Sequence, residues 1–147
     1  MLVQHLGGGH GRWVIPQKRL GAEFVPDFVI GEMSSIGYEW QLVELESPEA
    51  PLFTRSGDPS KHLNHALRQI DDWRAWLEKN RDYAARPLDQ GGLGLTDISS
   101  AASALILLGR RKSLSPKDNG RRRQMIARTG VQIHTYDYIA DAIQGRI

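Results

Sequence analysis

The sequence predicts a single α/β domain, because apolar residues follow strand spacing in some segments and helical spacing in others. Residues 24–30 and 38–46 are β-rich and joined by a short turn, which predicts an antiparallel hairpin. Residues 59–83 carry apolar side chains at helical spacing. Residues 101–108 are a nearly continuous apolar run, typical of a strand buried on both faces. With 40% hydrophobic residues, the 147-residue chain is long enough to form one such domain over residues 1–147.

Shorter elements are expected before the hairpin and after the buried strand. Residues 1–11 are rich in glycine and are expected to be a flexible N-terminal segment. Residues 13–20 are β-rich, but Pro16 interrupts them, which suits an edge strand or a bend. Asp58 followed by Pro59 is expected to cap the helix at residues 59–83. The elements expected after the buried strand are a helix at residues 115–128 that Gly130 ends, a short strand at 131–134 and a helix at 136–144.

The composition excludes several classes of protein. No cysteine is present, so neither a disulfide framework nor a thiolate metal site is possible, and a reducing cytoplasm is expected. The longest apolar run, residues 101–108, is too short to span a bilayer, and no export signal is visible. The sequence therefore predicts a soluble, cytoplasmic protein without a membrane partner.

The net charge of +2 is too small to indicate nucleic-acid binding by itself. Basic residues nevertheless gather at residues 110–112 and 121–123, and the two clusters are candidates for a common phosphate-binding surface. A solvated basic face explains them equally well. The candidate nucleic-acid contacts are Arg110, Arg111, Arg121 and Arg122.

Two glutamates are the most informative feature of the chain. Residues two apart in a strand point to the same side, so Glu44 and Glu46 share a face while Val43 and Leu45 point into the core. Neighbouring carboxylates on a hydrophobic strand repel each other and are costly to bury without a cation. A hard divalent ion such as Mg²⁺ or Mn²⁺, which prefers oxygen ligands, would compensate them.

Asp27 is the third candidate ligand, since it stands at the start of the preceding strand among apolar residues. Pairing in the hairpin would bring it beside Glu44, and the two carboxylates would then hold the metal. Glu46 would be a third ligand or the base that orients the attacking water. The alternative stays open that Glu46 faces solvent at a strand end and that Asp27 only forms a turn.

The helix at residues 59–83 offers further candidates. His65, Gln69 and Trp73 share one side of it at four-residue steps, so Gln69 is a candidate partner for a metal-bound water or a phosphate. A polar flank beside the core explains Gln69 equally well and is favoured for His65. Trp73 and Trp76 are expected in the core rather than as platforms for bases.

Lys18 is a candidate for a catalytic lysine, because it is expected on the strand before Asp27. An ordinary surface charge is an equal alternative. The other histidines show no pair of ligands at helical spacing with an acid between them, so no zinc site is expected. They are His5, His10, His62 and His134.

Several motifs resemble a known family. Pro26-Asp27 with Glu44-Leu45-Glu46 resembles the PD-(D/E)XK motif in the variant form in which glutamate replaces lysine. Gln69 four residues before Trp73 resembles the Gln-x-x-x-Tyr motif of RecB-like nucleases. The chain from about residue 12 to the C-terminus resembles the nuclease domain of Shedu antiviral proteins, in particular at residues 43–48, 52–54, 57–60, 63–66, 68–73, 108–111 and 135–137.

This resemblance implies a restriction-endonuclease-like fold, with a central mixed sheet, antiparallel and then parallel, between flanking helices. It further implies DNA cleavage with Mg²⁺ or Mn²⁺, a homo-oligomer and a role in defence against phage. The catalytic residues would be Asp27, Glu44, Glu46 and Gln69. The motif lysine is absent, so a catalytically silent nucleic-acid-binding or assembly module is the alternative. The leading helical segment of such nucleases is also missing, and the chain is expected to be a short form or the effector part of a larger protein.

Overall fold

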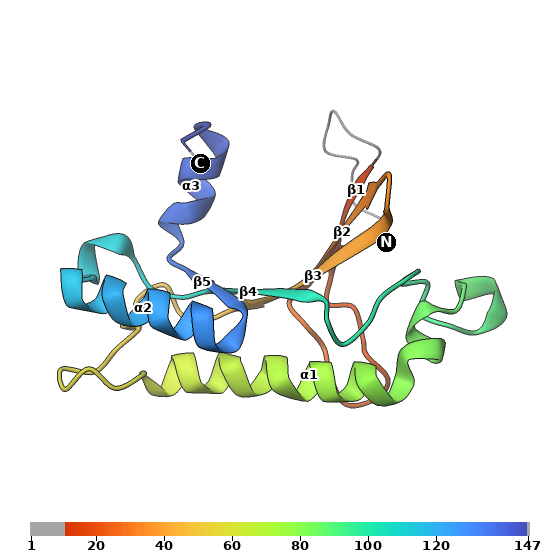
Figure 1. Ribbon diagram of the computed structural model, residues 1–147, viewed down its shortest axis with the longest axis horizontal. Coiled ribbons are helices and arrows are strands. Elements are labelled where there is room, and N and C mark those ends of the chain that lie inside the picture. The colour runs from red at the N-terminus through yellow and green to blue at the C-terminus, as the bar shows by residue number, and fades with distance from the viewer. Residues whose placement is uncertain (1–10, 147) are drawn as a thin grey trace. The chain divides into compact units, whose positions relative to one another are not determined.

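The computed structural model describes residues 11–146, so most of the flexible segment expected at residues 1–11 lies outside the described residues. Figure 1 shows the arrangement of the helices and strands. The strands are β1 (Arg12–Pro16), β2 (Phe28–Ser34), β3 (Gly37–Leu45), β4 (Ser103–Leu107) and β5 (Val131–His134). The helices are α1 (Lys61–Ala85), α2 (Pro116–Thr129) and α3 (Asp137–Ile143), with the short 3-10 helices η1 (Leu88–Gln90) and η2 (Arg111–Ser113).

The five strands form one mixed sheet in the order β1-β2-β3-β4-β5. β2 pairs antiparallel with both β1 and β3, whereas β4 and β5 pair in parallel. This arrangement confirms the α/β class and the mixed sheet. β1 ends at Pro16 and lies at the edge of the sheet, as the missing N–H of proline predicts.

The chain divides into two compact units. The first contains residues up to 43 together with residues 69–103, and the second contains residues 44–68 together with residues from 104 onward. β3 and α1 each contribute residues to both units. Among the described helices, none combines the length and the apolar character needed to cross a membrane.

The hairpin of the first unit is shorter at its start than the sequence predicts. Ser34 pairs with Gly37, so a two-residue turn connects β2 and β3 as expected. β2 begins at Phe28 rather than at residue 24, and Phe24 instead forms an isolated bridge with Leu20. Pro26 explains the delay, because proline has no N–H to donate to a neighbouring strand.

Trp40 organises the core of the first unit. Its indole Nε1 donates a hydrogen bond to the carbonyl of Thr96 at 2.7 Å. Gly31 is its register partner on β2, and a Cβ at this position would lie 2.6 Å from the Trp40 ring. Only glycine therefore allows the ring to cover this strand. The other fully buried large side chains of this unit are Leu20, Leu42, Ile70, Trp73, Leu77, Leu95 and Ile98.

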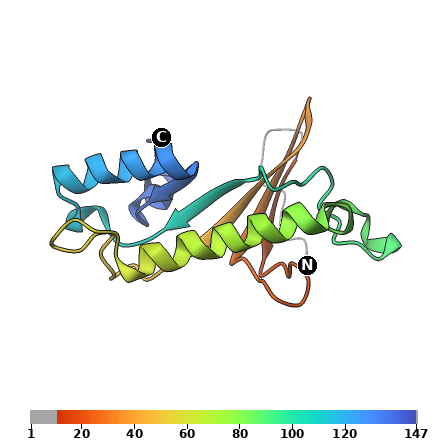
Figure 2. The same ribbon diagram turned by 60° about the horizontal axis from the view of Figure 1, so that its bottom comes forward.

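Helix α1 is the long yellow-green to green helix in Figure 2. It begins two residues later than predicted. The hydroxyl of Ser60 accepts a hydrogen bond from the N–H of Leu63 at 3.2 Å, so Ser60 rather than Asp58 caps the helix. Asp58 belongs to the preceding loop, where its carboxylate accepts a hydrogen bond from Ser56 at 2.9 Å. The prediction of Asp58 as the cap was wrong, because Pro59 forms a bridge with Phe53 before the helix starts.

The second unit follows its sequence signals closely. Ser115 and Asp118 form a reciprocal capping box at the start of α2, and Gly130 ends the helix with a left-handed φ of 66°. β4 is buried along residues 104–107, as its apolar run predicts. Met125 of α2 and Val131 and Ile133 of β5 are also buried.

The carboxylates of α3 hold the segment that contains η2. Asp137 accepts a hydrogen bond from the backbone N–H of Arg111 at 2.8 Å and one from the side chain of Arg110 at 3.3 Å. Arg111 also forms an ion pair with Asp141, one turn further along α3. The Arg111 N–H, followed by the Arg110 side chain, lowers the pKa of Asp137 from 3.8 to about 2.

We expect Ser60→Ala to lower the free energy of unfolding by about 1 kcal/mol, because the N–H of Leu63 loses its cap. Asp58→Ala is the control. The observed side-chain hydrogen bond of the Asp58 carboxylate is with the exposed hydroxyl of Ser56. Urea denaturation measures both variants. A loss from Asp58→Ala that equals or exceeds the loss from Ser60→Ala would assign the cap to Asp58.

Asp137 should make stability depend on pH in the acid range. Its pKa is lower in the folded chain, so its contribution is present above about pH 4 and is lost as the pH falls towards 2. In Asp137→Asn this part of the acid dependence should be missing, as urea midpoints measured across this range would show. The exposed Asp71 provides the control substitution Asp71→Asn. Identical pH profiles for Asp137→Asn and the unsubstituted protein would contradict the proposed linkage.

Candidate metal centre

Glu44 and Glu46 stand where β3 ends, at Leu45. Glu44 is buried, with 5% of its surface exposed, on the same side of the strand as the buried Leu42. Val43 is buried on the other side, as expected, but Leu45 is only half-buried. β3 is therefore covered on both sides at Glu44, and a carboxylate in such surroundings requires partners.

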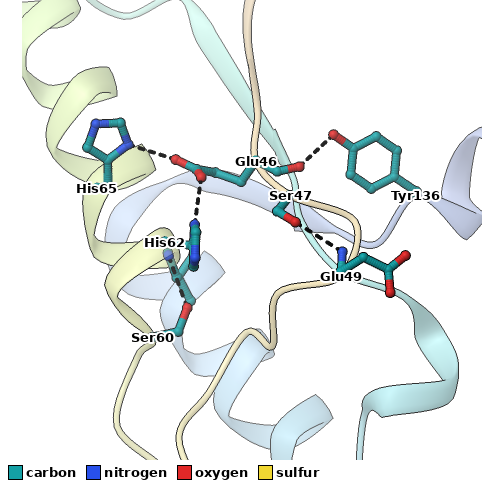
Figure 3. A network of polar contacts seen from close by, with 8 residues as sticks. Glu46, Ser47, Glu49, Ser60, His62, His65 and Tyr136 are labelled. Carbon is teal, nitrogen blue, oxygen red and sulfur yellow. Dashed lines mark hydrogen bonds and ion pairs between the residues drawn. The ribbon is translucent and has the colours of Figure 1, made fainter.

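The backbone of Glu46 is held from two sides within the second unit. Its N–H donates to the carbonyl of Leu107 in β4 at 2.9 Å. Its carbonyl accepts a hydrogen bond from the hydroxyl of Tyr136, directly before α3, at 2.7 Å (Figure 3). These two hydrogen bonds fix the backbone at the residue that directly follows β3. The backbone position of Glu46 is thus determined by residues that lie 61 and 90 positions further along the chain.

Two histidines from the first turns of α1 bind the carboxylate of Glu46. His62 Nδ1 lies 3.1 Å from Oε2, and His65 Nδ1 lies 2.7 Å from Oε1 (Figure 3). A neutral histidine with its proton on Nδ1 makes such a contact as a donor and leaves Nε2 as an acceptor. Each carboxylate oxygen has two lone pairs, so Glu46 can keep these contacts and still accept another partner.

The described residues of this unit contain one group with the spacing of a metal site. Glu44, Glu46 and His65 each offer a ligand atom, and these atoms all lie within 4.8 Å of one another. The donor set of two carboxylates and one imidazole fits a divalent cation, and Mn²⁺ accepts carboxylate ligands. His65 keeps 56% of its side chain exposed, so the group is open to solvent on that side. The spacing and the donor set are those of a candidate site for a divalent metal ion.

The contacts of both histidines were not predicted from the sequence. A histidine pair was expected to bind metal only with an acid between the two on the same helix, whereas the acid here directly follows β3. A polar flank was favoured for His65, and the structure adds its contact with Glu46. The signal that was available is the three-residue spacing of His62 and His65, which puts both on one side of a helix.

Asp27 and Gln69 belong to the first unit, and their roles at the site remain predictions. Asp27 directly precedes β2 and is half-buried, and Gln69 is half-buried on α1. Trp73 lies on the same side of α1 as Gln69. It is 1% exposed and therefore lies in the core, as predicted. Trp76 is half-buried and lies edge-on to Tyr83.

Lys18 lies in the turn after β1 and not on the strand, which ends at Pro16. The expected placement on a strand was wrong, because Gln17 takes up a positive φ of 48° that ends the extended chain. Lys18 lines a cavity of the first unit together with Trp13 and Trp40, and burial lowers its pKa.

The arginines predicted to contact nucleic acid differ in their surroundings. Arg110 and Arg111 pair with the acids of α3, and Arg121 contacts Asp118 at 3.1 Å. Arg122 forms no ion pair within the described part of the chain and is half-buried. The two predicted clusters do influence each other, since Arg111 and Arg123 both lower the pKa of Arg122 after the effect of burial.

Comparison with known proteins gives one family. The sequence matches a family model described as the C-terminal region of the Shedu protein SduA over residues 9–139. A search of curated proteins gives no match. The matched range contains both glutamates, both histidines and the four predicted arginines. Because the match covers most of its 147 residues, the chain belongs to the family of the Shedu protein SduA, C-terminal domain.

Proposed function

We propose that this domain is a divalent-metal-dependent DNA nuclease of the PD-(D/E)XK type that acts in defence against phage. The observation that carries the proposal is the convergence of Glu44, Glu46 and His65 within 4.8 Å in a chain of the Shedu family. Family membership supports the role in defence, and the ligand geometry supports metal-dependent chemistry. Cleavage itself is the part that requires experiment.

Glu44 is the central ligand in this proposal. It is the most buried of the three groups, and a bound cation would compensate its charge. His65 adds a nitrogen ligand, which favours Mn²⁺ over Mg²⁺, because Mg²⁺ is bound mainly through oxygen. When bound, the metal polarises the scissile phosphate and lowers the pKa of a coordinated water.

Glu46 replaces the lysine of the commoner motif, and its role differs accordingly. A carboxylate accepts a proton from the attacking water or joins the metal shell, whereas lysine brings a positive charge to the water. His62 acts as a positioning residue, since its Nδ1 holds one oxygen of Glu46 at 3.1 Å. In this way the histidine and the helix that carries it keep the carboxylate directed at the site.

A catalytically silent nucleic-acid-binding module is the second candidate function. Both oxygens of Glu46 already have protein partners, which is also what a purely structural network would look like. The two candidates differ in whether the group takes up metal and whether DNA is cut. Cleavage of plasmid and linear DNA with Mn²⁺, with Mg²⁺ and with a chelator tests this directly. Activity that is lost in the chelator supports the nuclease, and intact DNA under all conditions supports the silent module.

We expect Glu46→Gln to cut the cleavage rate by about a hundredfold or more, because the amide cannot accept the proton of the water. Glu44→Gln should abolish cleavage and weaken Mn²⁺ binding more than Glu46→Gln does. Calorimetry of Mn²⁺ binding and a cleavage time course measure the two effects. Glu49→Gln is the matched control, because Glu49 is exposed and lies three residues after Glu46 in the same unit (Figure 3). Near-normal cleavage by Glu46→Gln would refute the base role.

His62→Ala should weaken Mn²⁺ binding or cleavage by about 10–100-fold, the size of effect known for groups that orient metal ligands. The fold should survive, since His62 is partly exposed. The conservative variant His62→Asn, which keeps a donor, should restore part of the effect. Wild-type metal affinity and cleavage in His62→Ala would show that Glu46 needs no such support.

Asp27→Asn decides whether the first unit contributes a ligand. If the prediction from the sequence holds, this variant should lose Mn²⁺ affinity as Glu44→Gln does, and Gln69→Ala should reduce cleavage more than stability. Thermal unfolding in the absence of metal separates folding from binding. Unchanged Mn²⁺ binding and cleavage in Asp27→Asn would confine the ligands to the second unit.

A further inference from the structure

A cavity in the second unit is lined by residues from η2, α2, the end of β5 and α3. Its volume is about 270 Å³, just below the range of roughly 300–1,000 Å³ for sites that hold drug-sized ligands. The lining residues used below are Arg111, Asn119, Arg122, His134, Tyr138 and Asp141. None of them belongs to the group formed by Glu44, Glu46 and His65.

The charges in this cavity are not balanced. Asp141 pairs with Arg111, so the acid that lines the wall is already engaged. Arg122 has no such partner among the described residues, although it is half-buried. Burial has the largest effect on the pKa of Arg122 and lowers it, and the positive charges of Arg123 and Arg111 lower it further. The guanidinium is therefore partly shielded from water and close to like charges. An anion in the cavity would relieve both conditions.

Two aromatic side chains also line the cavity. The rings of His134 and Tyr138 stack with their centroids 4.2 Å apart and their planes 22° from parallel. Burial, followed by Arg122, lowers the pKa of His134 below its usual 6.5, so the ring is mainly neutral at pH 7. A stacked aromatic pair of this kind offers a surface on which a base can lie.

The side chain of Asn119, which also lines the cavity, could accept a hydrogen bond from a ligand. Its side-chain oxygen is buried and has no hydrogen-bond partner in the folded chain. A buried acceptor without a partner is destabilising, and a ligand with a hydroxyl or an N–H group would satisfy it. Inorganic phosphate at neutral pH can donate through its own hydroxyl, and a nucleotide adds sugar hydroxyls and base N–H groups as further donors.

We propose that this cavity is a nucleotide-binding site in which Arg122 holds a phosphate group beside the His134–Tyr138 stack. The phosphate belongs either to a free nucleotide or to one unit of a nucleic-acid strand, and the chemistry of recognition is the same. Arginine suits this task because its planar guanidinium can form two parallel hydrogen bonds to phosphate oxygens. The site does not depend on the proposed metal centre.

The test measures binding in a chelator, so that no cleavage occurs. The probes are adenosine monophosphate and inorganic phosphate, followed by calorimetry, and a fluorescent short single-stranded DNA, followed by anisotropy. Arg122→Met removes the charge and keeps a long apolar side chain, whereas Arg122→Lys keeps the charge. Arg128→Met is the matched control, since Arg128 is an exposed arginine on the same helix.

Arg122→Met should weaken binding of the phosphate-containing ligand about tenfold or more, the usual loss when a charged hydrogen bond is removed. Arg122→Lys should retain part of the affinity. Tyr138→Ala should weaken adenosine monophosphate or DNA but leave inorganic phosphate unchanged, because only the former two have a base to stack. Glu49→Gln, a substitution of an exposed residue outside both sites, should bind all probes as the unsubstituted protein does.

The pattern across the probes identifies the source of the phosphate. Loss of adenosine monophosphate binding in Arg122→Met assigns a free nucleotide, and loss confined to DNA assigns a phosphate of the strand. Equal effects of Arg122→Met and Arg128→Met on every probe would overturn the proposal, since only the general positive charge would then matter. Unchanged binding in Arg122→Met would overturn it as well. Far-UV circular dichroism of both methionine variants controls for folding.

Discussion

The second compact unit depends on how it compensates two carboxylates at the end of a buried strand. Glu44 is almost fully buried, and the side chain of Glu46 follows on the same side of the chain. Helix α1 has no acidic residue in its own first turn, where an acid would interact favourably with the helix dipole. Glu46 reaches this end of the helix through His62 and His65. These two contacts therefore satisfy a carboxylate, orient two histidines and connect the start of α1 to the end of β3.

Under the proposed function, these contacts would allow glutamate to stand where the commoner motif has lysine. A lysine would have compensated the neighbouring acids directly, and its loss leaves an excess of negative charge. The imidazole N–H groups offset part of this charge without introducing a permanent cation. The remaining charge is what gives the group its affinity for a divalent ion in the proposed function.

Positive charge is distributed unevenly over the same unit. The carboxylates of Asp137 and Asp141 engage Arg110 and Arg111, and Asp118 engages Arg121 within the capping box of α2. These arginines stabilise the positions of α3 and of the helix start, which limits their availability for a phosphate backbone. Arg122 differs because it forms no ion pair in the described part of the chain. The four predicted arginines thus differ in their partners. Three of them form ion pairs, whereas Arg122 forms none in the described part of the chain.

The sequence by itself determined the features that depend on local periodicity and on the backbone. The turn before Gly37, the burial of β4, the capping box at Ser115 and the end of α2 at Gly130 all follow from residues close together in the chain. The pair of Glu44 and Glu46 was likewise visible from strand alternation. The family resemblance was visible from motifs spread over the chain, and the match over residues 9–139 bears it out.

The tertiary structure alone decided which side chains meet. Pro26 delays β2, and the bridge at Pro59 moves the cap of α1 from Asp58 to Ser60. His62 and His65 became site residues only because α1 begins next to the end of β3. The physical reason is that periodicity depends on neighbours along the chain, whereas hydrogen bonds and ion pairs such as those of Glu46 join segments far apart in it. The packing of strands and helices decides which side chains form these bonds, and the local sequence pattern does not contain that information.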